Sequence, residues 1–159
     1  MKNTIIATLL VLTFIGCQRQ AKETMPSFNL LLTDNTTVLN TGHIPTGKPV
    51  MLVYFSPDCD HCQKVTEDLL KNIKALSNVQ FYFLTIDPLD RLKVFNEYYG
   101  IDKYPNITLG RDYEFFFYQH FDKTGITPYL VLYDRHKDLK VLYPGGTEAK
   151  TIIEAIEKL

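Results

Sequence analysis

A short apolar run that ends near a pair of closely spaced cysteines constrains the fold of this chain most. Residues 49–55 read PVMLVYF, with strand-forming side chains and no alternation of apolar and polar positions. Such a run is typical of a strand that lies in the middle of a sheet and is buried on both faces. The Cys-Asp-His-Cys motif of residues 59–62 follows almost at once. The sequence therefore predicts a central strand that delivers Cys59 and Cys62 to the start of the next element.

Apolar patterns elsewhere predict strands and helices in alternation. Residues 62–76 place apolar side chains at helical spacing, which predicts an amphipathic helix directly after the motif. The same patterns predict a strand over 79–86, a helix over 88–100 that ends at Gly100, strands over 129–134 and 140–143, and a helix over 147–159 that begins at Thr147. This order indicates an α/β domain with a central mixed sheet flanked by helices.

Two further segments have simple structural interpretations. Residues 135–138, RHKD, lie between two predicted strands and predict a hairpin turn whose charged side chains are solvated. Residues 113–121, YEFFFYQHF, are dense in aromatic side chains and predict packing in the core. Neither segment is expected to bind a ligand.

Composition limits the size of the fold and the class of partner. The chain has 159 residues, which is one ordinary domain after removal of a targeting segment. Seventeen Lys and Arg residues against eighteen Asp and Glu give a net charge of −1. A phosphate backbone needs an excess of basic residues, so nucleic acid is excluded as a partner.

The first residues have the layout of a bacterial export signal. Residues 1–16 combine an N-terminal lysine with an apolar stretch too short to span a bilayer, which predicts a cleaved signal peptide. The segment FIGC resembles a lipobox, with Phe14 where leucine is usual, so Cys17 is expected to carry the lipid anchor. Residues 17–25 then form the lipidated cysteine and a polar tether, whose eight residues after Cys17 reach at most roughly 26 to 29 Å. The folded domain, residues 26–159, is therefore expected in the cell envelope, at a membrane that faces the periplasm.

The spacing of Cys59 and Cys62 indicates thiol chemistry. If Cys59 opens the helix, the two side chains lie one turn apart on the same face, close enough for a disulfide after a small adjustment. Unpaired N–H groups at the helix start favour the thiolate at Cys59, which makes it the attacking sulfur. Cys62 lies a turn further in, where burial disfavours charge, and is expected to resolve the mixed disulfide.

These features resemble the thioredoxin superfamily. In that family a buried strand leads to a CxxC motif at a helix start, and a cis-proline lies beside the two sulfurs. GITPYLVLYD, with Thr127 and Pro128 before an apolar strand, is similar to that second element, so the resemblance places both residues in a groove for the substrate. The segment PSFNLLLTDNTTVLN and the extra strand–helix material between Asp87 and Gly125 are similar to TlpA-like, membrane-tethered thiol–disulfide oxidoreductases of the bacterial envelope.

The residues around the cysteines depart from the family pattern. Asp58 stands where tryptophan is frequent, and the negative charges of Asp58 and Asp60 are expected to raise the thiol pKa of Cys59. A protonated His61 is expected to lower it. Asp58 is also a candidate for the N-cap of the helix. We therefore interpret Asp58, Asp60 and His61 as residues that tune the redox chemistry.

The proton acceptor for Cys62 is a second departure. Val53 and Val65 stand at positions where relatives carry a buried acid or a glutamate. Glu67 and Asp87 are the remaining candidates in this chain.

Three alternatives compete with thiol–disulfide exchange. A thioredoxin-like copper-handling protein would need both thiolates and a distant histidine, whereas His43, His120 and His136 are scattered along the sequence. A surface lipoprotein without enzymatic activity would use the pair as a structural disulfide, although so short a loop stabilises weakly. A peroxidase is the weakest alternative, since Ser56 stands where peroxiredoxins carry threonine.

The sequence thus predicts a thiol–disulfide oxidoreductase, acting either as a reductase or as an oxidase. Its expected partners are cysteines of substrate proteins and a redox partner protein. No metal and no cofactor beyond the Cys59–Cys62 disulfide is expected.

Overall fold

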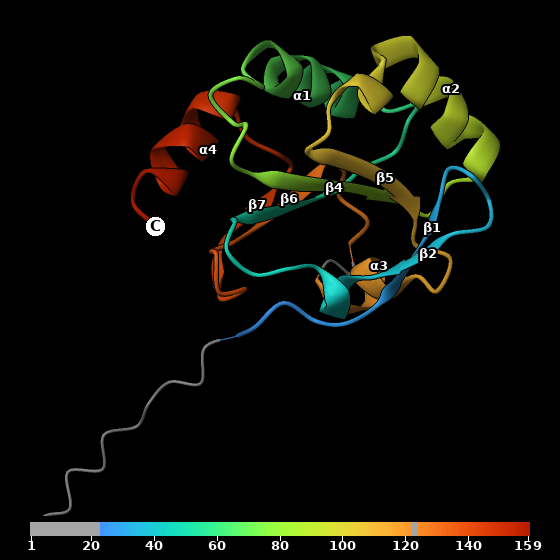
Figure 1. Ribbon diagram of the computed structural model, residues 1–159. Coiled ribbons are helices and arrows are strands. Elements are labelled where there is room, and N and C mark those ends of the chain that lie inside the picture. The colour runs from blue at the N-terminus through green and yellow to red at the C-terminus, as the bar shows by residue number, and fades with distance from the viewer. Residues whose placement is uncertain (1–22, 122–123) are drawn as a thin grey trace, which may run out of the picture.

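The computed structural model describes residues 23–121 and 124–159. In these residues a mixed sheet has the strand order β2-β1-β5-β4-β3-β6-β7 (Figure 1). The elements are β1 (Asn29–Leu32), β2 (Val38–Asn40), η1 (Thr41–His43), β3 (Val50–Tyr54), α1 (Asp60–Lys71), β4 (Gln80–Thr85), α2 (Leu89–Tyr99), η2 (Ile101–Lys103), β5 (Ile107–Arg111), α3 (Phe116–His120), β6 (Tyr129–Tyr133), β7 (Leu139–Pro144) and α4 (Ala149–Ile156). The signal peptide, Cys17 and most of the tether lie outside the described residues.

Strand β3 lies in the interior of the sheet, as the sequence predicts. It pairs in parallel with β4 and antiparallel with β6, and all five of its residues are buried. Because β3 and β4 run in parallel, α1 must cross over one face of the sheet between them. The predicted α/β fold with a mixed sheet is confirmed, and α1 begins at the carboxyl end of β3.

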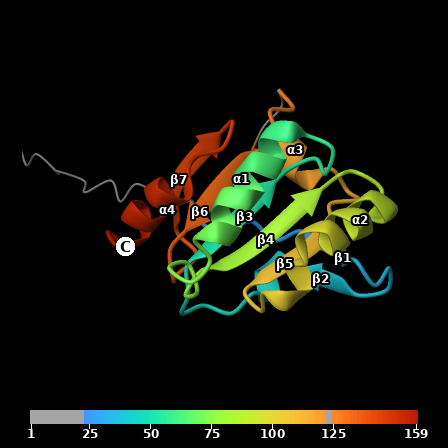
Figure 2. The ribbon, with the colours of Figure 1, turned by 90° about the horizontal axis from the view of Figure 1, so that it is seen from above.

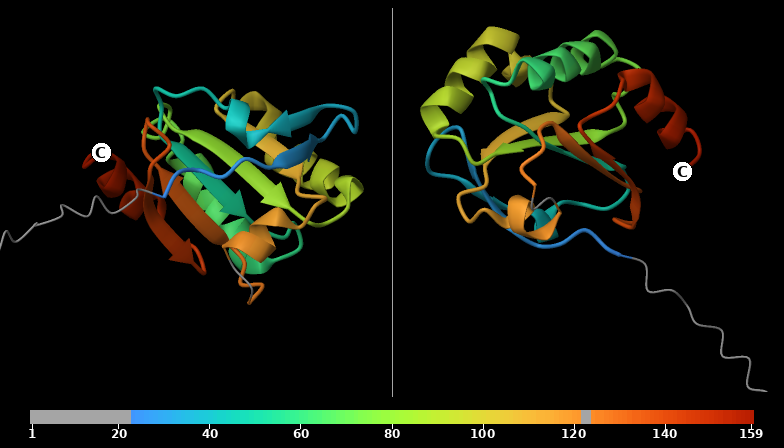
Figure 3. Two further views of the ribbon diagram at one scale, coloured as in Figure 1. Left: turned by 90° about the horizontal axis from the view of Figure 1, so that it is seen from below. Right: turned by 180° about the vertical axis from the view of Figure 1, so that it is seen from behind.

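Helices cover both faces of the sheet. Helices α1, α2 and α4 lie over one face (Figure 2), and α3 lies with the N-terminal segment against the other (Figure 3). Side chains that alternate along each strand point to opposite faces of the sheet. Val53 and Phe83 belong to the core under α1. Leu52 and Leu84 belong to the core on the opposite face. No helix among the described residues has the length and apolar character needed to cross a bilayer.

The region between α1 and β6 adds elements to the sheet. Helix α2 ends at Gly100, which adopts the left-handed conformation expected of a helix C-cap, with φ of 60°. Strand β5 then pairs with both β4 and β1, and it lies in the segment where the resemblance implies an extra strand and helix. Its Gly110 allows β1 to approach closely, because a Cβ at that position would lie 2.9 Å from Cβ of Leu30.

Two predicted details differ at the ends of the helices. Helix α1 ends at Lys71 and not at residue 76. Helix α4 begins at Ala149, and Thr147 does not cap it; instead, the carboxylate of Asp68 on α1 accepts the N–H of Ala149 at 2.7 Å. A side chain from another helix therefore satisfies the start of α4 and joins the two helices.

The aromatic segment is only partly in the core. Phe117 of α3 is fully buried and stacks on Tyr54, with ring centroids 4.7 Å apart, as the sequence predicts. Phe115 and Tyr118 are 44% and 39% exposed. The short helix therefore has one buried aromatic face.

The hairpin turn between β6 and β7 has the predicted position, but one of its charges is not solvated. Lys137 is 9% exposed, and among the described residues its Nζ has no hydrogen-bond partner. Residues 23–25, which the sequence assigns to the tether, cover this turn: Met25 N–H donates to the carbonyl of Lys137 and Leu139 N–H to that of Glu23. Burial lowers the pKa of Lys137 to about 8.

Replacement of Lys137 by methionine should stabilise the protein at neutral pH by about 1 to 3 kcal/mol. The buried amine costs free energy while it is protonated. Because its folded pKa of about 8 lies below the ordinary 10.5, the unfolded chain binds more protons between these values, and wild-type stability rises with pH across that window. The advantage of Lys137→Met should therefore shrink toward pH 10.5. Urea unfolding at neutral and alkaline pH measures this, and an equal advantage at both would contradict it.

Candidate active site

Cys59 occupies the N-cap of α1. Its backbone is extended, with φ of −86° and ψ of 114°, and its Sγ accepts the N–H of Cys62 at 3.3 Å. The N-cap position places this sulfur among the unpaired N–H groups of the first helical turn. Asp58 is therefore not the N-cap, contrary to one expectation from the sequence. The cysteine itself performs that role.

The Thr-Pro element lies beside Cys59. The thiol of Cys59 donates to the carbonyl of Thr127, with the sulfur 3.9 Å from the oxygen, and the peptide between Thr127 and Pro128 is cis. The residues are adjacent because β3 and β6 pair with Tyr54 opposite Tyr129. The sheet register thus brings Cys59, Cys62, Thr127 and Pro128 together from positions far apart in the sequence.

The two thiols are free and differ in acidity. Burial raises the pKa of Cys59, but hydrogen bonds from the side chain and the backbone N–H of Cys62 outweigh it, so the net pKa lies below the ordinary 9.0. Cys62 is 1% exposed, and burial together with the hydrogen bond and charge of Cys59 raises its pKa to about 12. The half-buried sulfur is therefore the more acidic and the more accessible of the two, which are the properties that a nucleophilic cysteine requires.

Alkylation should separate the two cysteines by pH. The thiolate is the reactive form, so the rate of Cys59 alkylation by iodoacetamide should rise with pH and reach half of its maximum below pH 9.0, while Cys62 remains unreactive. Quantitative mass spectrometry of the two labelled peptides measures both rates. In Cys62→Ala, which lacks one hydrogen-bond donor to the Cys59 thiolate, the profile should move to higher pH. Equal rates at both cysteines would contradict the asymmetry.

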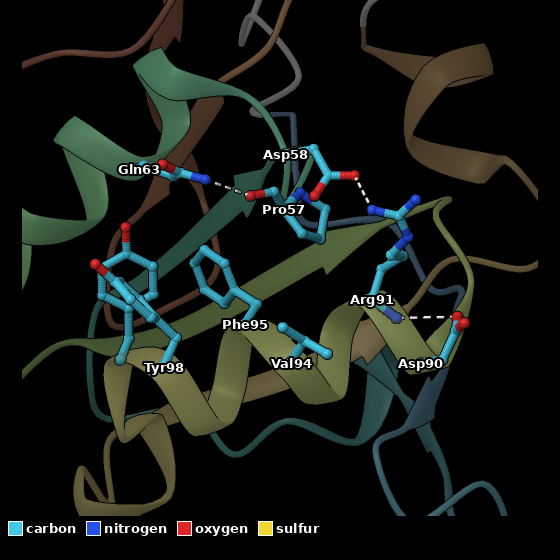
Figure 4. A pocket seen from close by; sticks show the side chains of 9 residues that line it. Pro57, Asp58, Gln63, Asp90, Arg91, Val94, Phe95 and Tyr98 are labelled. Atoms are coloured by element: carbon cyan, nitrogen blue, oxygen red, sulfur yellow. Dashed lines mark hydrogen bonds and ion pairs between the residues drawn. The ribbon is translucent and has the colours of Figure 1, made fainter.

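The three tuning residues differ in their surroundings. Asp58 forms an ion pair with Arg91 of α2, with 2.6 Å between Oδ2 and NH1 (Figure 4). Asp60 is exposed in the first turn of α1. His61 is also exposed, and its Nε2 lies 2.8 Å from the carbonyl oxygen of Gly145, to which it donates. Arg91 and Gly145 are site residues that the sequence did not indicate.

Gly146 packs closely against the ring of Pro128. A Cβ at this position would lie 2.8 Å from Cγ of Pro128 and 3.2 Å from Cγ2 of Val65. Only a glycine permits this close approach, and its φ of 84° is also one that other residues rarely adopt. The two glycines before α4 therefore contact both sides of the site: the carbonyl of Gly145 accepts from His61, and Gly146 lies against Pro128.

A sequence profile of the thioredoxin-like domain matches residues 43–159. The chain belongs to the thioredoxin-like domain family. Solved structures share the fold of this thioredoxin-like domain at low sequence identity. A secreted Mycobacterium tuberculosis disulfide oxidoreductase homologous to E. coli DsbE has a TM-score of 0.67 and 15% identity, over 83% of this chain and 96% of that one. The exposed lipoprotein thioredoxin Etrx1 of Streptococcus pneumoniae has a TM-score of 0.64 and 19% identity, over 84% and 100%.

StoA of Bacillus subtilis has a TM-score of 0.62 and 12% identity, over 82% of this chain and 96% of that one. No curated protein matches the sequence. The predicted membership of the thioredoxin superfamily is confirmed.

The candidate proton acceptors of this thioredoxin-like domain lie elsewhere. Glu67 is exposed on α1, and the carboxylate of Asp87 accepts the hydroxyl of Thr85 at 3.0 Å. The groups that act on the Cys62 thiol are Cys59, Ser56 and Thr127. The structure therefore gives no support to Glu67 or Asp87 in that role.

The histidines of the thioredoxin-like domain are also dispersed. His43 lies in η1, His120 in α3 against the ring of Phe116, and His136 in the hairpin turn. Within residues 23–121 and 124–159, no group of three or more His, Cys, Asp or Glu side chains is placed to hold a metal ion. The copper-handling alternative thus has no ligand set in the described part of the chain.

Proposed function

We propose that the chain is a thiol–disulfide oxidoreductase that exchanges disulfides with protein cysteines in the bacterial cell envelope. The observation that carries this proposal is the unequal pair of thiols, with an acidic, half-buried Cys59 at a helix start beside Thr127 and a buried Cys62 one turn away. A structural disulfide needs neither the difference in acidity nor the open position of one sulfur.

The reaction proceeds in two thiol–disulfide exchange steps. The Cys59 thiolate attacks one sulfur of a substrate disulfide, which forms a mixed disulfide and releases the other substrate sulfur as a thiolate. Cys62 then gives its proton to the substrate thiolate just released and attacks Sγ of Cys59, which forms the Cys59–Cys62 disulfide and releases the second substrate thiolate. Two electrons pass to the substrate. The same steps in reverse oxidise a dithiol, and a redox partner protein restores the starting state.

The surroundings of Cys59 support a protein as the substrate. The site has an exposed rim, and the backbone of Thr127 lies beside the sulfur where an extended substrate segment would pass. Structures of the same fold include a secreted disulfide oxidoreductase and an exposed lipoprotein thioredoxin, which accords with work outside the cytoplasm.

The N-terminal sequence supports attachment to a membrane. A signal peptide over 1–16 and a lipid on Cys17 would leave five residues, 18–22, between the lipidated cysteine and the folded domain, because Glu23, Thr24 and Met25 pair with the hairpin turn. Five residues reach at most roughly 16 to 18 Å. The domain would therefore act on substrates within a short distance of the membrane surface.

A trapping experiment tests the proposal. Cys62→Ala removes the resolving thiol, so mixed disulfides between Cys59 and substrates should persist in cells that express it. Nonreducing electrophoresis and mass spectrometry then identify the captured proteins and the cysteines involved. The matched control is Cys59→Ala/Cys62→Ala, which should capture nothing. Absence of captured protein in the single variant would refute exchange with protein substrates.

A further inference from the structure

A pocket of about 580 Å³ is lined in part by Pro57 and Asp58, the two residues that precede Cys59 in the chain. Pro57 and Asp58 form one wall, and the residues of α2 that face them form the other, among them Arg91, Val94 and Tyr98 (Figure 4). Asp58 precedes Cys59 in the chain, so their Cα atoms are only about 3.8 Å apart. Any protein bound at Cys59 therefore comes within reach of this pocket.

The α2 wall carries apolar side chains that the core does not use. Leu92 and Phe95 already pack the helix against the sheet. Val94 and Tyr98 line the pocket beside Phe95 and are 64% and 77% exposed. Single exposed apolar residues are common on protein surfaces. Two that line the same pocket near a reactive cysteine form a partly apolar surface of the kind to which a partner protein binds.

The edge of the pocket nearest Cys59 is polar. Arg91 and Asp58 form an ion pair there, and Asp90 adds a second carboxylate to the lining. An apolar interior with a polar rim is the usual arrangement where a side chain of a partner protein is buried. The volume of the pocket and the ring of Tyr98 in its wall suit an aromatic side chain, because aromatic rings stack or pack edge-on against one another.

We infer that this pocket receives an aromatic side chain that a substrate protein carries within about three residues of its reactive cysteine, since three extended residues span roughly 10 to 11 Å. The inference rests on the proposed function and adds the substrate class. The occupant is a segment of a substrate protein because the pocket is continuous with the surface that a substrate must cover when its sulfur reaches Cys59.

Peptides of defined sequence test the inference. Each peptide carries one cysteine in a mixed disulfide with 5-thio-2-nitrobenzoate and, apart from one alanine-only peptide, a phenylalanine at one position within three residues of that cysteine. The protein is the full chain with Cys17→Ser and Cys62→Ala, in reduced form. The Cys59 thiolate attacks the peptide sulfur, a Cys59–peptide disulfide forms, and the coloured nitrobenzoate thiolate leaves as the reduced product.

The measured quantity is the ratio of second-order rate constants for phenylalanine and alanine peptides. At least one phenylalanine position should react about tenfold faster than alanine. In a variant that adds Val94→Ser/Tyr98→Ser the ratio should fall to about one, and the ratio cancels any general effect on Cys59. The control pair Val38→Ser/Tyr113→Ser, which alters an exposed valine and an exposed tyrosine elsewhere, should keep the preference.

The outcomes separate the two proposals. Equal rates for all peptides in the parent protein overturn the pocket inference and leave the proposed function standing. No reaction with any peptide overturns the proposed function as well. A ratio that responds equally to both serine pairs, or a dimer in sedimentation that only Val94→Ser/Tyr98→Ser dissociates, overturns the inference, the latter because the occupant is then a second copy of the chain.

Discussion

Cys59→Ala should abolish the reduction of insulin disulfides by dithiothreitol-primed protein, to the rate of dithiothreitol alone. The loss should be at least about 1,000-fold, because removal of a covalent nucleophile leaves no other group in the site to form the mixed disulfide. Cys62 does not replace it, since its thiol is 1% exposed and its pKa is raised to about 12. The turbidity of precipitating insulin B chain, followed over time, measures the rate.

A matched variant controls for the loss of one thiol. Cys17→Ser also removes a cysteine, but that cysteine is the expected lipid site, so it should reduce insulin at the wild-type rate in solution. Circular dichroism checks that Cys59→Ala is folded. A Cys59→Ala protein that is folded and still reduces insulin through Cys62 would reverse the roles that acidity and burial assign to the two sulfurs.

The fold and the centre of the site could be predicted because their signals are local. The apolar run of β3 needs only its own residues to indicate a buried strand, and the helical spacing after Cys62 marks α1 in the same way. Prediction of the substrate groove needed the family resemblance as well. Thr127 and Pro128 were placed beside Cys59 by resemblance, and the pairing of β3 with β6 provides the physical reason.

The surroundings of the cysteines could not be predicted because they depend on contacts between distant segments. The Asp58–Arg91 ion pair joins a loop to α2, and His61 donates to a carbonyl on the β7–α4 loop. Neither contact leaves a periodic pattern in the sequence. Lys137 shows the same limit, because a charged turn residue is normally solvated, whereas this one is 9% exposed in a turn with which residues 23–25 pair.

Gly146→Ala should damage both stability and activity. A side chain at a φ of 84° costs about 1 to 2 kcal/mol. The new Cβ, 2.8 Å from Cγ of Pro128, must push the proline or the loop away, at a further cost of about 1 to 3 kcal/mol. Because Pro128 follows the carbonyl that contacts Cys59, the displacement should lower insulin reduction by about 10- to 100-fold. Urea unfolding and the insulin assay measure the two effects.

Gly145→Ala isolates the contact with the proline from the backbone strain. Gly145 has nearly the same φ, 82°, but a Cβ there meets nothing within 4 Å. The Gly145→Ala variant should therefore be less stable by only about 1 to 2 kcal/mol, the cost of the strained backbone. It should retain most of the activity, because the carbonyl of residue 145 still accepts from His61. The difference between the two variants measures how far catalysis depends on the position of Pro128. Equal activity losses in both would show that the turn conformation, and not support of the proline, is what the glycines provide.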